Sequence, residues 1–555
     1  MDNFQIANMF SLLAKLMDIH GANSFKSKSY AIAAFQLEKA TEQVAGMELK
    51  QIASLKGIGD SASKKIAEIL ATGELKILTD LIEATPEGVM EMLNIKGLGP
   101  KKIQTVWKEM EIESIGELLY ACNENRLTLF KGFGEKTQKN IKETIEFYLR
   151  HQGSFLYAQI EKISQHLLAQ LQEIVAPARV FVSGDAAMRN DTIEVIHFIT
   201  DCNVEKLIKG LVEKGVAYEQ DESQNILFKM EEGLRVNINC VPAERLMQTV
   251  FASNSSEEFL ETFHKKHSIA DLDQFATEEE YFTSVGLPPL PAYLRHHGAT
   301  MELAMQKKLP RLIQVSDIKG MIHTHSNWSD GSFTIAQMAA AAIAKGFEYL
   351  VISDHSKSAF YANGLVEDRI TAQHLEIDAL NELLAPFRIY KSIESDILND
   401  GSLDYSDDIL ESFDLVIASV HNNLKMSQEK AMQRLLAAIE NPYTTILGHM
   451  TGRLLLSRNG YPVDHKAIID ACVENNVVIE INAHPRRLDI DWRWIPYAVK
   501  KGALLSIDPD AHTIDGFDDI RHGVMAAQKG LLTAADNLSS FSITDFERFL
   551  IDRRS

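Results

Sequence analysis

Apolar residues in the first 150 positions recur at intervals of three and four, which is the spacing of one face of an α-helix. The clearest sets are Leu12, Leu13, Leu16 and Met17, and then Ile66, Ile69 and Leu70. The pattern predicts that this part of the chain is helical.

The same region holds three near-copies of one short motif, an apolar residue, Lys, Gly, an apolar residue and Gly, at 55–59, 95–99 and 130–134. The spacing of about 35–40 residues is close to that of helical-hairpin repeats. Such a turn exposes backbone N–H groups at a helix N-terminus, where they can bind a phosphate oxygen. The first two copies are predicted to contact DNA phosphates, whereas the third could be a plain helix connector. The candidate DNA-binding residues are Gly57, Gly59, Lys64, Gly97, Gly99, Lys101 and Lys102.

Residues 151–300 alternate β-rich runs with helical stretches, which predicts an α+β unit with a mostly antiparallel sheet. The predicted strands cover 178–182, 192–199 and 234–241. The polar segment 253–258 is predicted to be a loop, and the proline cluster at 287–291 ends the unit.

In residues 316–555, short apolar runs alternate with amphipathic stretches such as 335–345 and 428–439. The predicted strands are 320–323, 349–353, 388–393, 415–420, 445–447, 477–481 and 503–507. Repeated β-then-α units predict a parallel, barrel-like α/β domain.

Histidine and carboxylate residues follow most of these strands where each one ends. His323 and His325 stand at i and i+2, so regular strand geometry would point both side chains to one face. The C-terminal ends of barrel strands meet at one mouth, which would gather these residues into one cluster. The candidate metal ligands are His323, His325, Asp330, His355, Glu394, His421, His449, Asp510 and His512. His484 is predicted to lie near the mouth without being a ligand.

The mixture of imidazoles and carboxylates favours Zn, Mn or Fe over Mg or Ca. Glu394 could bridge two cations, and closely spaced metals can activate a water and hold phosphate oxygens. One histidine at a strand end is more often a hydrogen-bonded core residue than a ligand. Here the pattern recurs at six or more strands, which favours a multi-metal phosphoesterase whose nucleophile is a metal-bound water.

Composition narrows the class of protein. The formal net charge of −21 excludes a globally basic nucleic-acid binder, so any DNA contact must use local patches or backbone donors. Four dispersed cysteines without a CxxC pair predict neither a zinc knuckle nor a disulfide framework. No apolar run approaches the ~20 residues that span a bilayer, and no secretory signal is visible, so we expect a cytoplasmic protein without membrane association.

Residues 316–555 resemble the PHP (polymerase and histidinol phosphatase) domain. The matching motifs are His-Thr-His at 323–325, Ser-Asp-Gly at 329–331, Asp-His-Ser at 354–356, Gly-His at 448–449, Thr-Gly-Arg at 451–453, Ile-Asn-Ala at 481–483 and Asp-Ala-His at 510–512. The resemblance implies a distorted (β/α)7 barrel with up to three ions, Mn²⁺ or Zn²⁺, and all nine metal positions of the family pattern are filled. Met450 stands where relatives often have proline.

The whole chain is similar to bacterial family X DNA polymerases that carry a C-terminal PHP domain. Residues 23–34 fit their small lyase-like domain, and 276–288 fit the segment before the PHP domain. The resemblance implies a lyase-like domain with a helix-hairpin-helix at 1–75, a second helix-hairpin-helix region at 76–150, a palm-like domain at 151–300 and the PHP domain at 316–555. Lys65 aligns with the family's Schiff-base lysine, but Ser61 replaces a supporting lysine, which favours an ordinary solvated or phosphate-facing Lys65.

The palm-like region departs from that family. A polymerase palm needs three carboxylates to hold two cations. The Gly-Ser pair is lost at 183–185, the paired-aspartate strand keeps at most Glu194, and Asn237 takes the third position. The nucleotide-binding stretch is also eroded around 252–258. The sequence predicts a degenerate palm, with Asp185 as the one residue that could rescue it.

The leading hypothesis is a DNA-repair protein whose hairpins bind DNA and whose PHP site is a 3′→5′ exonuclease. An active DNA polymerase is favoured by the overall resemblance and opposed by the palm residues. A small-molecule phosphatase resembling histidinol phosphatase is opposed by the hairpins. A non-catalytic DNA-binding scaffold is opposed by the complete ligand set.

Overall fold

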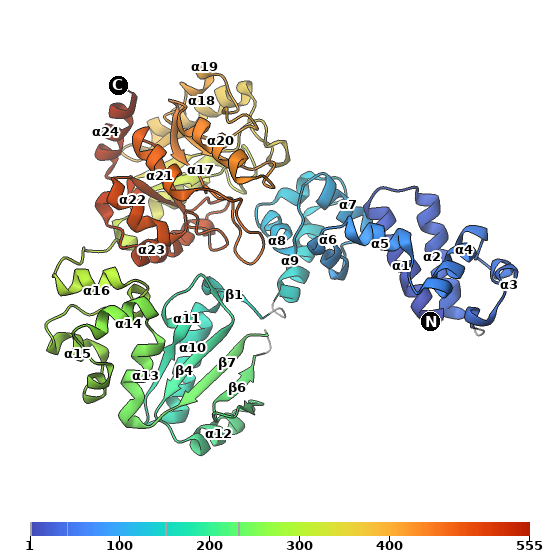
Figure 1. Cartoon of the computed structure of the whole chain (residues 1–555). Helices are drawn as coiled ribbons and strands as arrows, with labels where there is room; N and C mark the ends of the chain where they lie inside the picture. The colour runs from blue at the N-terminus through green and yellow to red at the C-terminus, as the bar shows by residue number, and fades with distance from the viewer. Residues whose placement is uncertain (1–2, 41–42, 150–152, 231–232, 555) are drawn as a thin grey trace. The chain divides into compact units, whose positions relative to one another are not determined.

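The computed structural model describes residues 3–40, 43–149, 153–230 and 233–554. The chain divides into two compact units, Met1–Tyr148 and Leu149–Ser555 (Figure 1). The predicted boundary between residues 150 and 151 falls outside the described residues.

The first unit is helical, as its apolar periodicity predicts. Its helices are α1 (Asn3–Ile19), α2 (Ser24–Lys39), α3 (Leu49–Ser54), α4 (Asp60–Thr72), α5 (Lys76–Glu83), α6 (Glu87–Glu91), α7 (Pro100–Lys108), α8 (Ile115–Asn123) and α9 (Glu135–Leu149), with 3₁₀ turns at Val44–Gly46, Met92–Asn94 and Arg126–Leu129. Helix α1 packs along α2 and also contacts α5 and α7. Leu13, Leu16, Ile66 and Ile69 are buried, so the predicted faces form the core.

The three glycine motifs share one backbone geometry. The first glycine of each motif has a left-handed φ, +81° at Gly57, +91° at Gly97 and +96° at Gly132, which glycine adopts without strain. In each turn the following apolar N–H donates to the carbonyl three residues earlier, in the pairs Ile58 to Leu55, Leu98 to Ile95 and Phe133 to Phe130. A helix begins directly after the second glycine, at Asp60, Pro100 and Glu135. The third copy is therefore the same kind of hairpin as the first two.

The α+β part of the second unit contains the predicted mostly antiparallel sheet. Its strands are β2 (Val180–Ser183), β4 (Val195–Thr200), β5 (Glu219–Gln220), β6 (Ile226–Lys229) and β7 (Arg235–Cys240), in the order β2-β4-β7-β6-β5. Only the β4–β7 pair is parallel among these described strands. Helices α10 (Tyr157–Val175) and α12 (Val204–Glu213) cover the buried face, where Ile196 and Val236 lie in the core.

Two sequence expectations are wrong in this part. The single strand predicted at 192–199 is broken at Glu194, because β3 (Thr192–Ile193) pairs with β1 (Phe155–Leu156) in a separate two-stranded sheet. The loop predicted at 253–258 shrinks to the gap between α13 (Leu246–Ser253) and α14 (Glu257–His264). The Ser256 hydroxyl caps α14 by accepting a hydrogen bond from the Phe259 N–H, so this polar residue begins a helix.

Short helices connect this sheet to the last part of the chain. They are α15 (Glu278–Ser284) and α16 (Gly298–Met305), with 3₁₀ turns at Ala243–Arg245, Ile269–Gln274 and Ala292–Leu294. Helix α11 (Gly184–Ala187) instead lies between β2 and β3. Their aromatic core is built on α13 and α14, where the rings of Phe251 and Phe263 lie 4.8 Å apart.

The C-terminal part forms the predicted parallel barrel. All seven predicted strands are present as β8 (Gly320–Thr324), β9 (Tyr349–Ile352), β10 (Arg388–Asp396), β11 (Leu415–Ser419), β12 (Thr444–Leu447), β13 (Val478–Asn482) and β14 (Leu505–Asp508). They pair in sequence order, and a bridge between Thr324 and Ala511 brings the end of β14 back to β8, so the barrel is nearly closed.

Helices surround the strands of this barrel (Figure 1). They are α17 (Ile335–Ala344), α18 (Glu367–Leu384), α19 (Asp407–Leu410), α20 (Gln428–Ile439), α21 (His465–Glu474), α22 (Ile495–Lys501), α23 (Ile520–Lys529) and α24 (Ile543–Arg554). The 3₁₀ turns are Val315–Asp317, Phe360–Ala362, Trp492–Trp494, Asp515–Asp519, Ala534–Asp536 and Leu538–Ser540. None of the helices in the described part of the chain combines the length and apolar character that a bilayer-spanning helix needs.

Candidate metal centre

All nine candidate ligands lie at the C-terminal ends of barrel strands. Two of them, His323 and Glu394, are inside β8 and β10, and the other seven are in the loops that directly follow strands. Their side chains are almost completely buried, and that of His421 is only 5 % exposed. The topology therefore gathers into one place residues that are up to 189 positions apart in the sequence.

Three overlapping groups of these side chains have geometry that could hold a metal ion. Within each group, the nitrogen or oxygen atoms that would be ligands lie within 4.8 Å of one another. The groups are His325, Asp330, His355 and His512; His323, His325 and Asp510; and His355, Glu394 and His421. The ninth residue, His449, lies beside the third group, with its Nε2 2.9 Å from Glu394 Oε1.

The backbone at His323 is not that of a regular strand, and the sequence argument is wrong on this detail. His323 has a φ of +59°, and the β8–β9 register shifts between Met321 and Thr324. Strand β8 ends at Thr324, so His325 lies outside it. The two imidazoles nevertheless face the same centre, with ring centroids 5.3 Å apart.

Two buried carboxylates that the sequence analysis missed orient the ligands. Glu480, in β13, contacts His323 Nδ1 and accepts a hydrogen bond from the His449 N–H. Asp396 Oδ1 lies 3.0 Å from His421 Nδ1. A carboxylate behind an imidazole fixes its tautomer and ring orientation, so the opposite nitrogen faces the centre. Glu480 could have been recognised as the one charged residue in the apolar run 477–482.

The donor atoms fit bound cations. Buried polar atoms without hydrogen bonds are costly, so proteins rarely leave them unsatisfied. Here several buried ligand atoms make no hydrogen bond with the described residues. They are His323 Nε2, His325 Nδ1, both ring nitrogens of His355, His449 Nδ1 and Glu394 Oε2. Such atoms, gathered from four strands, are what a set of divalent ions would satisfy.

The charge states of His355, His449 and Glu394 suit metal binding, whereas the carboxylates around His323 and His421 outweigh burial and raise the pKa of those two rings, so a bound cation would have to displace their protons. Burial lowers the pKa of His355 to about 4 and that of His449 to about 3, so both rings are neutral near pH 7. For Glu394, burial acts in the opposite sense, but His421, His323 and His355 outweigh it and hold the pKa of the carboxyl well below its usual range. Neutral imidazoles beside ionised carboxylates are the forms that coordinate Mn²⁺ or Zn²⁺.

The palm-like sheet is the five-stranded sheet β2-β4-β7-β6-β5, which lies in the region predicted to be palm-like. Its polar face differs from the barrel mouth in the residues that it carries. Val195 and His197 of β4 pair with Arg235 and Asn237 of β7, and these residues share the face opposite the buried core. Neither strand carries a carboxylate on that face. Glu194 is mostly exposed and lies 3.3 Å from Arg235, in an ion pair.

Asp185, the residue that could rescue a palm site, has a local partner. Its Oδ1 accepts a hydrogen bond of 2.7 Å from Asn190 Nδ2, in the turn that follows β2. A two-cation site needs several carboxylates that converge, and the polar face of β4 and β7 offers Asp185 no second carboxylate.

The candidate DNA-contact residues lie on the surface of the hairpins. A side chain at Gly59, Gly97 or Gly99 would meet open space, whereas one at Gly57 would approach Gln36 to 2.8 Å. Lys64 and Lys101 are exposed.

The remaining lysines of these hairpins have local partners. Lys102 Nζ donates to the Gly97 carbonyl at 3.3 Å, at the hairpin turn itself. Lys65 Nζ lies 2.6 Å from Glu68 Oε2, in an ion pair within α4.

Comparisons with known proteins agree with this geometry. Residues 1–75 match a helix-hairpin-helix domain, 89–146 a SAM-like helix-hairpin-helix tandem, and 322–484 the PHP domain. The DNA polymerase/3′-5′ exonuclease PolX of Bacillus subtilis (strain 168) is 32 % identical over 98 % of this chain and 98 % of its own length. The chain belongs to the PolX family. The tandem match includes the third hairpin.

Shorter stretches of this PolX-family chain also match probable phosphatases. A probable phosphatase of Caldanaerobacter subterraneus is 29 % identical, over 29 % of this chain and 60 % of its own length. The probable phosphatase YcdX of Escherichia coli O127:H6 is 28 % identical, over 35 % of this chain and 78 % of its own length.

Proposed function

We propose that this PolX-family protein binds DNA through its helical hairpins and hydrolyses phosphodiester bonds at the PHP centre, as a 3′→5′ exonuclease in DNA repair. The nine-residue cluster at the barrel mouth, in one chain with three alike hairpins, is the observation that carries this proposal. A small-molecule phosphatase would need the cluster and would not need the hairpins.

The cofactor in this proposal is Mn²⁺ or Zn²⁺, with up to three ions. The three groups of ligand atoms would hold them, with His449 as a further ligand and Glu394 as a carboxylate that could bridge two ions. When bound, the ions supply an activated water and positive charge for the phosphate oxygens. The chain's own contribution is to fix the ligands: Glu480 and Asp396 orient His323 and His421, and burial keeps bulk water from competing for the site.

The DNA partner is bound mainly by its phosphates. Open space at Gly59 and Gly99 lets a phosphate approach the N–H groups at the starts of α4 and α7. The exposed Lys64 and Lys101 would add charge next to these turns. With a net charge of −21 on the chain, this local chemistry has to supply the attraction.

The remaining parts take supporting roles in this proposal. Residues 1–75 and 76–150 would be the two DNA-binding regions, 151–300 a degenerate palm and 316–555 the hydrolase. Lys65 would serve as a phosphate-facing lysine, with lyase chemistry as the alternative. A cytoplasmic location fits a DNA substrate and four free cysteines.

Two other activities have specific support. The name of the Bacillus subtilis relative includes DNA polymerase, which favours synthesis, while the face of β4 and β7 opposes it. The phosphatase relatives favour a small phosphomonoester, but they match only 29 % and 35 % of this chain.

One experiment separates these activities. Purified protein with Mn²⁺ is offered end-labelled single-stranded DNA, a primer–template and histidinol phosphate in parallel. We expect stepwise shortening of DNA from the 3′ end and little release of phosphate from histidinol phosphate. Preferred hydrolysis of histidinol phosphate, or no DNA cleavage with any of Mn²⁺, Zn²⁺ and Mg²⁺, would overturn the proposal.

A further inference from the structure

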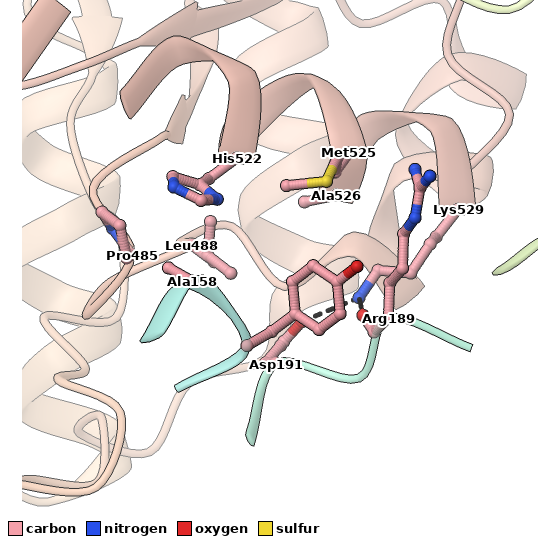
Figure 2. Close-up of a pocket in the computed structure, with 10 residues that line it drawn as sticks. Ala158, Arg189, Asp191, Pro485, Leu488, His522, Met525, Ala526 and Lys529 are labelled. Carbon is pink, nitrogen blue, oxygen red and sulfur yellow. Dashed lines mark hydrogen bonds and ion pairs between the residues drawn. The ribbon is translucent and has the colours of Figure 1, made fainter. Parts of the chain in front are cut away.

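A buried lysine connects the barrel to the palm-like part of the same unit. Lys529, at the end of α23, donates to the Arg189 carbonyl at 2.9 Å and to Asp191 Oδ1 at 2.8 Å (Figure 2). Its side chain is only 2 % exposed, and its ammonium lies 4.8 Å from the centre of the Trp492 ring. A buried charge is costly without a close partner of opposite charge. The buried Lys529 ammonium therefore depends on the Asp191 carboxylate.

Asp191 also reaches a second barrel cation. Its Oδ2 lies 3.5 Å from Arg453 Nη2, in the loop that follows the candidate ligand His449. Arg453 is held by the barrel as well, because its Nη1 donates to Asp491 at 2.7 Å and its Nε donates to the Arg487 carbonyl at 2.9 Å. One carboxylate of the palm-like part therefore joins two cations of the barrel.

Arg453 is connected to the metal centre along two routes. The N–H of its neighbour Gly452 donates to the His449 carbonyl at 2.8 Å. Arg487, whose carbonyl Arg453 holds, places its Nε 3.5 Å from Oδ2 of the candidate ligand Asp510. A shift of Arg453 would therefore move both His449 and the Arg487 guanidinium beside Asp510.

We propose that Asp191 is a positioning residue for the PHP centre, acting through Arg453 on the loops that carry His449 and Arg487. This inference rests on the proposed function and gives the palm-like part a role in hydrolysis, although it lacks a polymerase site of its own. Asp191 directly precedes β3, the short strand that pairs with β1 outside the five-stranded sheet. Nothing in a polymerase palm's chemistry requires a carboxylate there.

The same two parts share a second ion pair that serves as a matched control. Glu161 of α10 lies 3.0 Å from Arg521 of α23, and that arginine is 41 % exposed. This pair joins the same two parts, and among the described residues neither side chain is hydrogen-bonded or ion-paired with the 449–453 or 485–491 loops. If Asp191 acts only by holding the parts together, Glu161→Gln and Asp191→Asn should have effects of the same kind.

The experiment compares these two variants in the full chain. With Mn²⁺, kcat and KM are measured on end-labelled single-stranded DNA and on bis(p-nitrophenyl) phosphate, a small phosphodiester. Mn²⁺ binding to metal-stripped protein is measured by calorimetry. Changes in groups behind metal ligands typically cost about 10–100-fold in activity or metal affinity. For Asp191→Asn we expect a fall of roughly tenfold or more in kcat on both substrates and weaker Mn²⁺ binding, with KM for DNA little changed, whereas Glu161→Gln should match the wild type.

Several results would overturn the inference. They are wild-type kcat and Mn²⁺ affinity in Asp191→Asn, an equal loss in Glu161→Gln, or a defect confined to KM for DNA. If Asp191→Asn does not fold, Arg453→Lys keeps the charge and loses the fork of hydrogen bonds, and the same expectations and contrary results apply to it. If the wild type hydrolyses neither substrate, the proposed function fails, and the Mn²⁺ affinities of the variants still decide whether Asp191 positions the centre.

Discussion

The barrel and the palm-like sheet of this protein differ in what their polar faces carry. At the barrel mouth, imidazoles and carboxylates from five strands form three groups, and the potential ligand atoms of each group lie within 4.8 Å of one another. On the palm-like sheet, Val195, His197 and Asn237 occupy the face where cations would bind. Both sheets keep their cores, because most of the barrel ligands lie in loops after the strands, and the polar residues of β4 and β7 lie on the face opposite the core. Core and site residues can therefore change independently. A fold can therefore be kept whether or not its polar face carries a metal site.

The largest expected effect comes from removing ligands on the barrel side of this comparison. The double variant His323→Ala/His325→Ala should lower DNA hydrolysis by roughly a thousandfold or more, because it removes donors from two of the three ligand groups. DNA affinity, measured by fluorescence anisotropy, should stay within about twofold, since phosphate contacts are assigned to the hairpins. Undiminished cleavage by this variant would show that the barrel is not the active site for DNA hydrolysis.

A smaller effect is expected from the carboxylate behind the ligands. Glu480→Gln keeps the size of the side chain and weakens its hold on His323, so activity should fall about 10–100-fold. Exposed Glu474 of α21 offers a matched control, and Glu474→Gln should leave kcat unchanged. Equal activity in the two variants would mean that Glu480 does not orient the ligand.

The hairpins test whether DNA binding is separate from hydrolysis. Gly59→Leu/Gly99→Leu places side chains in open space with ordinary φ values of −86° and −75°, so the protein should still fold. Each leucine would crowd a bound phosphate, and we expect DNA affinity to fall about tenfold and to show a weaker dependence on salt. Gly46→Leu also meets open space, outside the hairpins, and should bind DNA normally. Unchanged affinity in the double variant would make the hairpins structural only.

The smallest effect distinguishes a buried core histidine from a ligand. His374 of α18 packs edge-on against Phe413, 5.0 Å away, and its Nε2 makes no hydrogen bond with the described residues. Burial, and then Lys391, lower the pKa of His374 to about 4. The unfolded state therefore binds more protons between pH ~6.5 and pH ~4, and stability is lost as the pH falls through this window.

Urea unfolding measures that loss. Between pH 6.5 and pH 4.5, His374→Leu should lose less stability than the wild type, by on the order of 1 kcal/mol, because leucine takes up no proton. Identical pH profiles would show that His374 is not held neutral by the fold. Hydrolysis at pH 7.5 should be the same in both proteins, since His374 is not among the candidate ligands.

Much of the barrel could be predicted from the sequence because its strands are buried on both faces and appear as short apolar runs. The candidate ligands could be predicted for the same reason, because each lies at the end of such a run or soon after it. The left-handed backbone at His323 and the shortened β8 were not, because a single sequence does not show where a strand departs from regular geometry.

Contacts between residues that are far apart in the sequence could not be predicted either. Glu480 and His323 are 157 residues apart, and Asp191 and Lys529 are 338 apart. Local spacing carries no information about such pairs, which only the closed barrel and its packing against the palm-like part bring together. The break at Glu194 could not be predicted either, because the run at 192–199 has β-strand propensity throughout. Only the pairing of β3 with β1 divides it.

The contrast between the two sheets can be tested in one reaction. A 5′-labelled primer–template is incubated with all four deoxynucleotides and Mn²⁺ or Mg²⁺, using the wild type and His323→Ala/His325→Ala, and the primer length is followed on a sequencing gel. We predict that the wild type shortens the primer and that the double variant leaves its length unchanged. Robust extension of the primer by the double variant would contradict the account, because it would show a working polymerase site on the palm-like sheet.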